Sequence, residues 1–213
     1  QVLHKADTIW TLPELLWIKN NEPDNWARVK KILFAKDYVR HSLTGDYVTD
    51  YIEAEGSMMF DINTMEWSCA LCKILDIDTE IMPKVVKPTD IGGRITEAAA
   101  KMTRLAEGTP VICGTTDTVR EVLAAGAVKK GQMTLKLATA GRICVVTDRP
   151  YPDINLIDYS HIIDGYFYPG TATKSCASSY RWFRDTFGED YAELDKKAGS
   201  VPIGSDGLVF HPY

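Results

Sequence analysis

The pattern that most constrains this chain is a strand, turn and helix over residues 109–126. A Thr-Pro pair opens the apolar run 111–113, the small residues 114–116 follow it, and apolar positions at helical spacing lead to Gly126. Such a pattern predicts a buried strand followed by an amphipathic helix. In open α/β sheets, ligands bind just beyond the carboxyl ends of strands. The carboxylate on this turn, Asp117, is therefore the first candidate for a functional residue.

Asp117 has two interpretations that the residues alone leave open. An Asp just before a helix is most often an N-cap that accepts hydrogen bonds from free backbone N–H groups. However, Thr118 and Glu121 have the Thr-x-x-Glu spacing of a capping box, which would satisfy the start of the helix by itself. In that case the carboxylate of Asp117 is free to do chemistry.

Composition limits the class of protein. The 213 residues are 45% hydrophobic and 25% charged, enough to build one large or two modest cores. The formal net charge of -5 argues against a nucleic-acid partner. The sequence contains no apolar run of membrane-spanning length and no signal peptide. We therefore expect a cytoplasmic protein that does not bind a membrane.

The cysteines do not indicate a disulfide framework or a metal site. Their number, five, is odd, which in a chain without a secretory signal favours reduced thiols. Cys69 and Cys72 form a Cys-x-x-Cys pair, but neither a second pair nor a histidine cluster completes a zinc site. We therefore expect no metal ligands among the residues of this chain.

Local patterns predict further elements along the chain. Capping signals and glycine stops predict helices after Thr11, with a capping box to Glu14, over 36–43, over 96–102 and over 175–187. Apolar runs predict strands or extended segments over 32–34, 47–51, 92–95, 133–137, 143–146, 166–168 and 208–213, and residues 83–88 are expected to be a connection.

A second candidate site is the turn between the strands expected at 133–137 and 143–146. It consists of the small residues Ala138, Thr139, Ala140 and Gly141, and a turn of this kind can wrap backbone N–H groups around a phosphate. Neither a P-loop nor a Gly-x-Gly-x-x-Gly fingerprint is present. We place the main domain boundary just before this hairpin, which divides the chain into residues 1–132 and 133–213.

With these segments in order, the chain resembles the FGGY carbohydrate kinases, and most closely their xylulokinase branch. Six segments carry the resemblance: 11–23 around Trp17, with Glu14 in place of the usual Lys, then Lys36-Asp-Tyr, 43–51, 54–59, Trp67-Ser and Gly114-Thr-Thr-Asp117. Any one of these motifs is weak, but the ordered set is specific, and it covers nearly the whole chain.

The resemblance implies an α/β protein of the actin and hexokinase type, with two ribonuclease H-like domains that are both incomplete here. Residues 1–132 would be the sugar-binding N-terminal domain without its first strands, and residues 133–213 the start of the nucleotide-binding domain. The implied reaction is ATP-dependent phosphorylation of a sugar hydroxyl, with Mg²⁺ and with a ketopentose such as xylulose, or a related ketose or polyol, as substrate. The chain alone is expected to be inactive. The protein is expected to form a homodimer.

The resemblance also assigns roles to residues of this sequence. Asp117 would be the general base that takes the proton from the sugar hydroxyl. Sugar contacts would come from Tyr51, Thr118 and Trp17. The phosphate turn would be formed by Ala138, Thr139 and Gly141, with Ala177 and Arg181 near the nucleotide.

Two departures from the family pattern motivate an alternative. Thr118 stands where the family has Asn or Gln, and Ala138 stands where it has Gly. The alternative is a non-catalytic sugar-binding or regulatory relative of the same fold. An actin-like structural ATPase would share the fold class, but it would not carry the segments around Trp17 and Tyr51.

Overall fold

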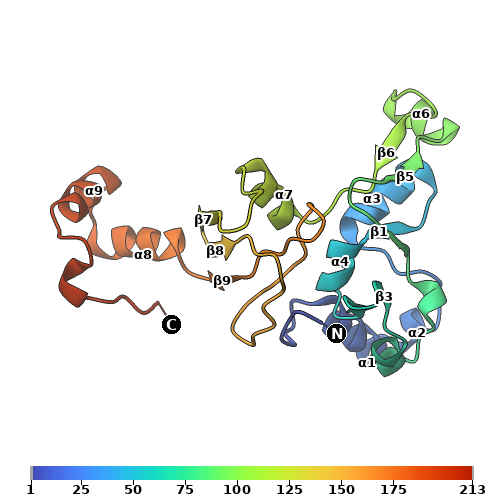
Figure 1. The fold of residues 1–213 in the computed structure, drawn as a ribbon, viewed down its shortest axis with the longest axis horizontal. Coiled ribbons are helices and arrows are strands. Elements are labelled where there is room, and N and C mark those ends of the chain that lie inside the picture. Colours follow the sequence, from blue (N-terminus) through green and yellow to red (C-terminus); the bar gives the residue numbers. More distant parts are fainter. Residues whose placement is uncertain (1, 213) are drawn as a thin grey trace.

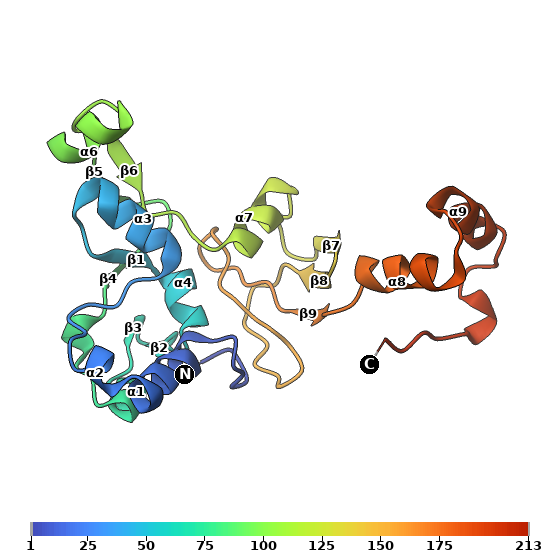
Figure 2. The same ribbon diagram turned by 180° about the vertical axis from the view of Figure 1, so that it is seen from behind.

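The computed structural model describes residues 2–212, so Gln1 and Tyr213 lie outside the described residues. Three parts of the chain follow one another in sequence order along the longest axis (Figure 1, Figure 2). Helices α1 to α6 and their short strands form an N-terminal part. The helix α7 and the sheet β7–β9 form a middle part, and α8 and α9 lie beyond it.

The N-terminal part combines helices with three two-stranded sheets. The sheets pair β1 with β4 in parallel, β2 with β3 antiparallel and β5 with β6 antiparallel. Its helices are α1 (Thr11–Asn21), α2 (Pro23–Trp26), α3 (Ala35–Thr44), α4 (Tyr51–Gly56), α5 (Cys69–Cys72) and α6 (Glu97–Thr103), with 3-10 turns η1 (Lys73–Leu75) and η2 (Thr79–Ile81). Its strands are β1 (Val48–Asp50), β2 (Phe60–Asp61), β3 (Glu66–Trp67), β4 (Lys84–Val86), β5 (Ile91–Arg94) and β6 (Pro110–Ile112).

The remaining elements carry the expected hairpin. Strands β7 (Met133–Leu137), β8 (Gly141–Val145) and β9 (Gly170–Thr173) form one antiparallel sheet in the order β7-β8-β9. Helix α7 (Asp117–Ala124) precedes this sheet. The helices α8 (Ala177–Phe187) and α9 (Tyr191–Gly199) and the 3-10 turn η3 (Ser205–Gly207) follow it.

Two apolar clusters hold these elements together. One lies under α1 and the 3-10 turns and consists of the buried residues Leu12, Ile32, Met58, Met59, Cys72, Leu75 and Met82. The other joins α4, α7 and β8 and consists of Tyr51, Ile52, Ala54, Phe60, Val119, Val122, Ala127, Cys144, Val146, Tyr159 and Tyr168. This second cluster binds the middle part of the chain to the N-terminal part, because its members come from both.

Several local predictions are confirmed. Helix α3 ends where Gly45 takes a left-handed conformation with φ 79° and its N–H donates to the carbonyl of His41. Helix α6 begins at Thr96, whose hydroxyl accepts the N–H of Ala99 at 3.2 Å. The strands expected at 92–95, 111–113, 133–137 and 143–146 are present as β5, β6, β7 and β8, and α8 ends before left-handed Gly188.

Other predictions are wrong for reasons that lie in tertiary context. Residues 32–34 form no strand, because the N–H of buried Ile32 donates to the carbonyl of Ile81 in the turn η2 rather than to a neighbouring strand. The expected connection 83–88 contains the strand β4, which pairs with β1. The prolines at its ends therefore bound a strand rather than exclude one.

The extended segments are also shorter than expected. The run 47–51 ends at Asp50, because this residue caps α4 and Tyr51 becomes the first helical residue. In 166–168 only Phe167 forms isolated bridges, to Thr147 and Ser160. Residues 208–212 form no strand, and Tyr213 lies outside the described residues.

Candidate functional site

Asp117 is the first residue of α7 and directly follows the turn after β6. Its side chain is exposed, and its Oδ1 accepts the backbone N–H of Thr118 at 2.7 Å and the hydroxyl of Thr118 at 3.3 Å. It forms no ion pair with any residue between 2 and 212. The carboxylate at the start of the helix is therefore open to a ligand.

The predicted capping boxes are wrong at both helices. Helix α7 begins at Asp117, two residues earlier than a cap at Thr118 predicts, so Thr118 is its second residue, and the N-cap Thr116 forms no side-chain cap. Glu121 accepts two hydrogen bonds from the ammonium group of Lys136 instead. At α1 the N-cap is likewise the preceding residue, Trp10, without a side-chain cap.

A buried charge cluster supports the turn behind Asp117. The Nζ of Lys36 lies 2.6 Å from Oδ1 of Asp37 and 2.8 Å from Oδ2 of Asp50. Arg40 pairs with Asp37 at 2.9 Å and donates to the carbonyl of Cys113, the last residue before the turn, at 2.7 Å. Thr115 donates its hydroxyl to Oδ1 of Asp50 at 2.8 Å.

This cluster fixes the backbone from which Asp117 projects. Asp50 also accepts the N–H groups of Ile52 and Glu53 and so caps α4. Burial lowers the pKa of Lys36, but the charges of Asp50 and Asp37 outweigh it, so the net shift is upward. Lys36 therefore stays protonated and holds its two buried carboxylate partners.

The pKa of Glu53, a residue of α4, is affected by the charge of Asp117. Burial raises the pKa of Glu53 to about 7, the charge of Lys36 opposes this shift, and the charges of Asp50, Asp37 and Asp117 add to it. The carboxyl group of Glu53 therefore changes charge near neutral pH, and the negative charge of Asp117 contributes to this displaced pKa.

Four hydrogen bonds connect α4 and the chain just after α7 with the segment 160–163. The hydroxyl of Tyr51 donates to the carbonyl of His161 at 3.1 Å, and Glu55 accepts the N–H and the hydroxyl of Ser160 at 2.8 and 2.5 Å. Nδ1 of His161 accepts the N–H of Ile163, so its Nε2 is the donor to the carbonyl of Ala127 at 3.0 Å. Burial lowers the pKa of His161, consistent with this neutral ring.

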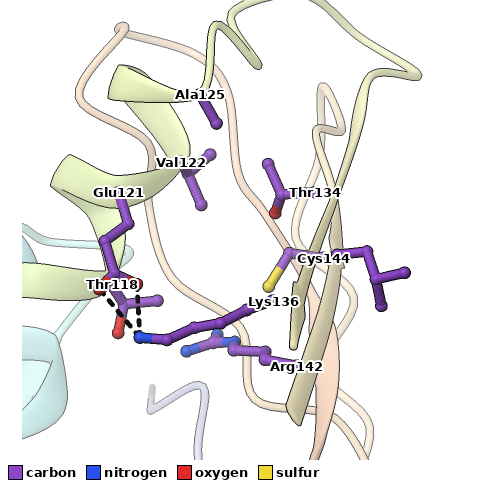
Figure 3. A pocket seen from close by; sticks show the side chains of 9 residues that line it. Thr118, Glu121, Val122, Ala125, Thr134, Lys136, Arg142 and Cys144 are labelled. Atoms are coloured by element: carbon purple, nitrogen blue, oxygen red, sulfur yellow. Dashed lines mark hydrogen bonds and ion pairs between the residues drawn. The ribbon is translucent and has the colours of Figure 1, made fainter. Parts of the chain in front are cut away.

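A cavity of about 320 Å³ opens between α7 and the hairpin β7–β8 (Figure 3). Lys136 and Arg142 extend from the two strands toward the side of α7 that carries Thr118 and Glu121. Its lining residues are Thr118, Glu121, Val122, Ala125, Thr134, Leu135, Lys136, Arg142 and Cys144. Thr118, a predicted sugar contact, therefore lies on the wall of a cavity that begins next to Asp117.

The predicted phosphate turn packs against the start of α8. The N–H groups of Cys176 and Ala177 donate to the carbonyls of Thr139 and Ala138, both at 2.9 Å. A Cβ on Gly141 would lie 3.1 Å from the Cβ and Sγ of Cys176, so the missing side chain permits this close approach. The turn carbonyls thus face α8, whereas no backbone carbonyl among residues 2–212 accepts the N–H groups of Thr139 and Ala140.

The structure brings together some of the predicted site residues and leaves others apart. Four of the five predicted nucleotide residues, Ala138, Thr139, Gly141 and Ala177, meet where the turn contacts α8. Arg181 is exposed one turn further along α8. Tyr51 is buried, and its hydroxyl is already engaged by His161.

Trp17 lies on α1, away from α7. Its side chain is 58% exposed and lines an outer groove with Thr8, Pro13, Glu14, Ile18 and Glu22. The structure therefore does not bring it to Asp117. Trp10 lies closer to the middle part, since it stacks on His4 with a centroid separation of 4.3 Å and meets Tyr159 edge-on.

The sequence alone did not identify the charged residues that shape the site through contacts with other elements. Lys36 and Asp50 lie in segments that carry the family resemblance, which could have pointed to a role for them. Arg142 follows the phosphate turn directly, so its place after that turn was a usable signal. For Glu53 and Lys136 the sequence contained no such signal, because the residues that surround them come from other elements.

Between residues 2 and 212 no group of three or more His, Cys, Asp or Glu side chains could hold a metal ion. Within the same residues no helix is long and apolar enough to cross a membrane.

Comparison with known proteins gives matches over most of the chain. The model of the N-terminal domain of the FGGY family of carbohydrate kinases matches residues 2–124. The chain is 31% identical over 208 residues to a protein named xylulose kinase from Lactococcus lactis, and the match covers 96% of this chain and 41% of the relative. It is 28% identical to a protein named gluconokinase from Bacillus licheniformis, covering 95% of this chain and 42% of the relative.

Among solved structures, the xylulose kinase from Rhodospirillum rubrum superposes with a TM-score of 0.90 at 28% identity. That match covers 97% of this chain and 43% of the solved chain. The sequence thus spans about two fifths of the length of the curated relatives that it matches, and Asp117 lies within the family model, close to its end.

Proposed function

This chain belongs to the FGGY family of carbohydrate kinases, and from that premise we propose that the whole protein transfers the γ-phosphate of ATP to a sugar hydroxyl. The α/β fold of the actin and hexokinase type, expected from the sequence, is confirmed by the solved sugar kinases that superpose on this chain. Residues 1–132 serve the sugar in this proposal, and residues 133–213 begin the nucleotide domain.

One observation carries the proposed chemistry. The carboxylate of Asp117 is exposed, has no cationic partner among the described residues and stands at a helix start that a buried charge cluster fixes. Phosphoryl transfer demands mainly positioning and electrostatics from the protein, and an Asp within reach of the attacking hydroxyl is a sufficient base. Asp117 accepts the hydroxyl proton as the new O–P bond forms.

The residues of the turn 138–141 fit a phosphate group. The N–H groups of Thr139 and Ala140 have no backbone acceptor within residues 2–212, and the hydroxyl of exposed Thr139 is available as a further donor. ATP with Mg²⁺ supplies the transferable phosphoryl group when it is bound. The turn orients that group, and Arg181 provides a positive charge further along α8.

The substrate, the location and the assembly are proposals for the intact protein. We propose a ketose such as xylulose, or a related polyol, as the acceptor, supported by relatives that carry the name xylulose kinase. Thr118, next to the base, contacts the sugar with its one hydroxyl. We place the protein in the cytoplasm, where ATP is abundant, and propose a homodimer, which size-exclusion chromatography with light scattering would test.

The test is ADP release by the intact protein with Mg-ATP across ketopentoses, ketohexoses, polyols and sugar acids. The variant Asp117→Asn is expected to lower kcat by about 10²- to 10⁴-fold with the sugar that stimulates release, the usual contribution of a general base. Asp148→Asn, which removes an exposed carboxylate elsewhere, is the control and should retain activity.

A second outcome favours the regulatory alternative. If calorimetry detects binding of a sugar but no sugar stimulates ADP release, the protein binds sugars without turnover and Asp117 is a turn residue. This alternative is supported by the two departures from the family pattern, Thr118 and Ala138.

A further inference from the structure

The cavity between α7 and the hairpin is lined by Arg142, two of whose guanidinium nitrogens are buried without a hydrogen-bonding partner among the described residues. Nε and Nη2 of Arg142 are buried, and neither donates to any residue between 2 and 212. No carboxylate within the same residues forms an ion pair with it. Buried N–H groups without partners are costly, and more so when they are charged, so an arginine held in this state calls for an explanation.

Two tyrosine rings hold the guanidinium group in place. Its central carbon lies 5.7 Å from the ring centroid of Tyr159 and 5.5 Å from that of Tyr168, both distances typical of cation–π contacts. These rings belong to the core cluster that joins α4, α7 and β8. The rings orient Arg142 without using the N–H groups on Nε and Nη2, which have no acceptor among residues 2–212.

The charges on the cavity wall sum to a positive value. Lys136 contacts both oxygens of Glu121, at 2.9 and 2.7 Å, so these two charges neutralise each other. Burial raises the pKa of the Cys144 thiol, which is therefore uncharged at neutral pH. Arg142 is left as the unbalanced charge of the lining, within a cavity that begins at Thr118 beside Asp117.

We propose that this cavity is an oxyanion site, in which Arg142 binds two oxygens of a reactant next to the general base. The planar guanidinium fork matches a carboxylate or a phosphate in bidentate geometry. Two sources of that anion exist at a kinase site: the carboxylate of a sugar acid and the phosphoryl group being transferred. The identity of the anion rests on the proposed function, whereas the anion site itself rests on the geometry alone.

The competing explanation is that Arg142 serves Asp158. Oδ1 of Asp158 is buried without a partner, and the charge of Arg142 partly offsets the rise that burial causes in the pKa of Asp158. The two groups are not within ion-pair distance, but a water molecule could join them. In that case substitution of Arg142 would lower stability and leave anion binding unchanged.

Titration calorimetry of the intact protein with gluconate and, separately, with inorganic phosphate distinguishes these explanations. The variants are Arg142→Gln, which removes the charge, and Arg142→Lys, which keeps it but loses the fork. Arg149→Gln is the matched control, because Arg149 also lies over a tyrosine ring, at 5.0 Å from the centroid of Tyr151, but is exposed. Circular dichroism establishes that each variant is folded, and Arg142→Lys keeps the test valid if Arg142→Gln does not fold.

The expected result is a loss of affinity of about tenfold or more in Arg142→Gln, an intermediate loss in Arg142→Lys and none in Arg149→Gln. If Arg142→Gln loses affinity for gluconate and its KM for ATP is unchanged, the site binds a substrate carboxylate. If Arg142→Gln loses affinity for phosphate and its KM for ATP rises with every sugar, the site binds the phosphoryl group. Wild-type protein that binds neither anion at millimolar concentrations, or variants that bind both unchanged, overturn the proposal.

Failure of the proposed function gives a different result. If no sugar stimulates ADP release, the kinase activity is absent, but the calorimetric arm still reports whether Arg142 binds an anion.

Discussion

Glu55 is a buried acid on α4 whose ionisation should make the stability of this protein depend on pH. The side chain is 1% exposed and accepts two hydrogen bonds from Ser160. Burial raises the pKa of Glu55 from 4.5 to about 8, although the bonds from Ser160 oppose this shift. The folded protein therefore keeps Glu55 protonated over a pH range in which the unfolded chain ionises it.

The sign and the size of the effect follow from linkage. Below about pH 4.5 the carboxyl group of Glu55 is protonated in both states. Between about pH 4.5 and about pH 8 only the unfolded chain loses the proton, so the free energy of unfolding falls by about 1.4 kcal/mol per pH unit. The total approaches about 5 kcal/mol and grows no further above pH 8.

The variant Glu55→Gln isolates this term, because glutamine is neutral at every pH and still offers an oxygen to Ser160. Denaturant unfolding of the intact protein, followed by tryptophan fluorescence, gives the free energy for wild type and variant across the range. Their difference removes the contributions of other displaced groups, such as Glu53, Asp158 and His4. The control is Glu107→Gln, at an exposed position.

Relative to the variant, the wild type should lose several kcal/mol of stability as the pH rises from about 4.5 to about 8. A difference that stays flat, or that grows in favour of the wild type at higher pH, refutes the claim that burial keeps Glu55 protonated.

Two further predictions concern the charge cluster and the phosphate turn. Lys36→Met leaves the buried carboxylate of Asp50 without its cation and should lower the free energy of unfolding by about 3–5 kcal/mol, measured with urea. Lys101→Met, which breaks an exposed pair on α6, should cost less than about 1 kcal/mol, and equal losses would contradict the argument. Gly141→Ala places a Cβ against Cys176 and should raise KM for ATP several-fold with KM for the sugar unchanged; an unchanged KM for ATP removes the turn from the nucleotide site.

Local signals in the sequence predicted most helices and the hairpin, because their determinants lie within a few residues. Thr96 caps α6 and Gly45 ends α3 through contacts that span at most four positions. The strand β4 was missed because its partner, β1, lies more than thirty residues earlier, and a prolyl boundary on each side suggested a connection. Pairing of this kind depends on tertiary context, which a window of sequence does not contain.

The candidate site shows the same division between local and distant determinants. Asp117 was predictable because a strand, a turn and a helix meet at one place in the sequence. The contacts that give the site its electrostatics join residues far apart, such as Thr115 with Asp50 and Tyr51 with His161, 65 and 110 positions away. The role of Arg142 depends on rings that lie in a later segment, so composition and spacing could not reveal it.

Helix α7 is held at both of its ends by bonds that lead to α4. Before its start, the hydroxyl of Thr115 binds Asp50, the N-cap of α4. After its end, the carbonyl of Ala127 accepts Nε2 of His161, whose own carbonyl accepts the hydroxyl of Tyr51. The side chain of Asp117 hydrogen-bonds only to its neighbour Thr118 within the described residues, so its position follows from the backbone of α7. The placement of the proposed base therefore depends on α4, and a substitution there can alter catalysis without touching a reactant.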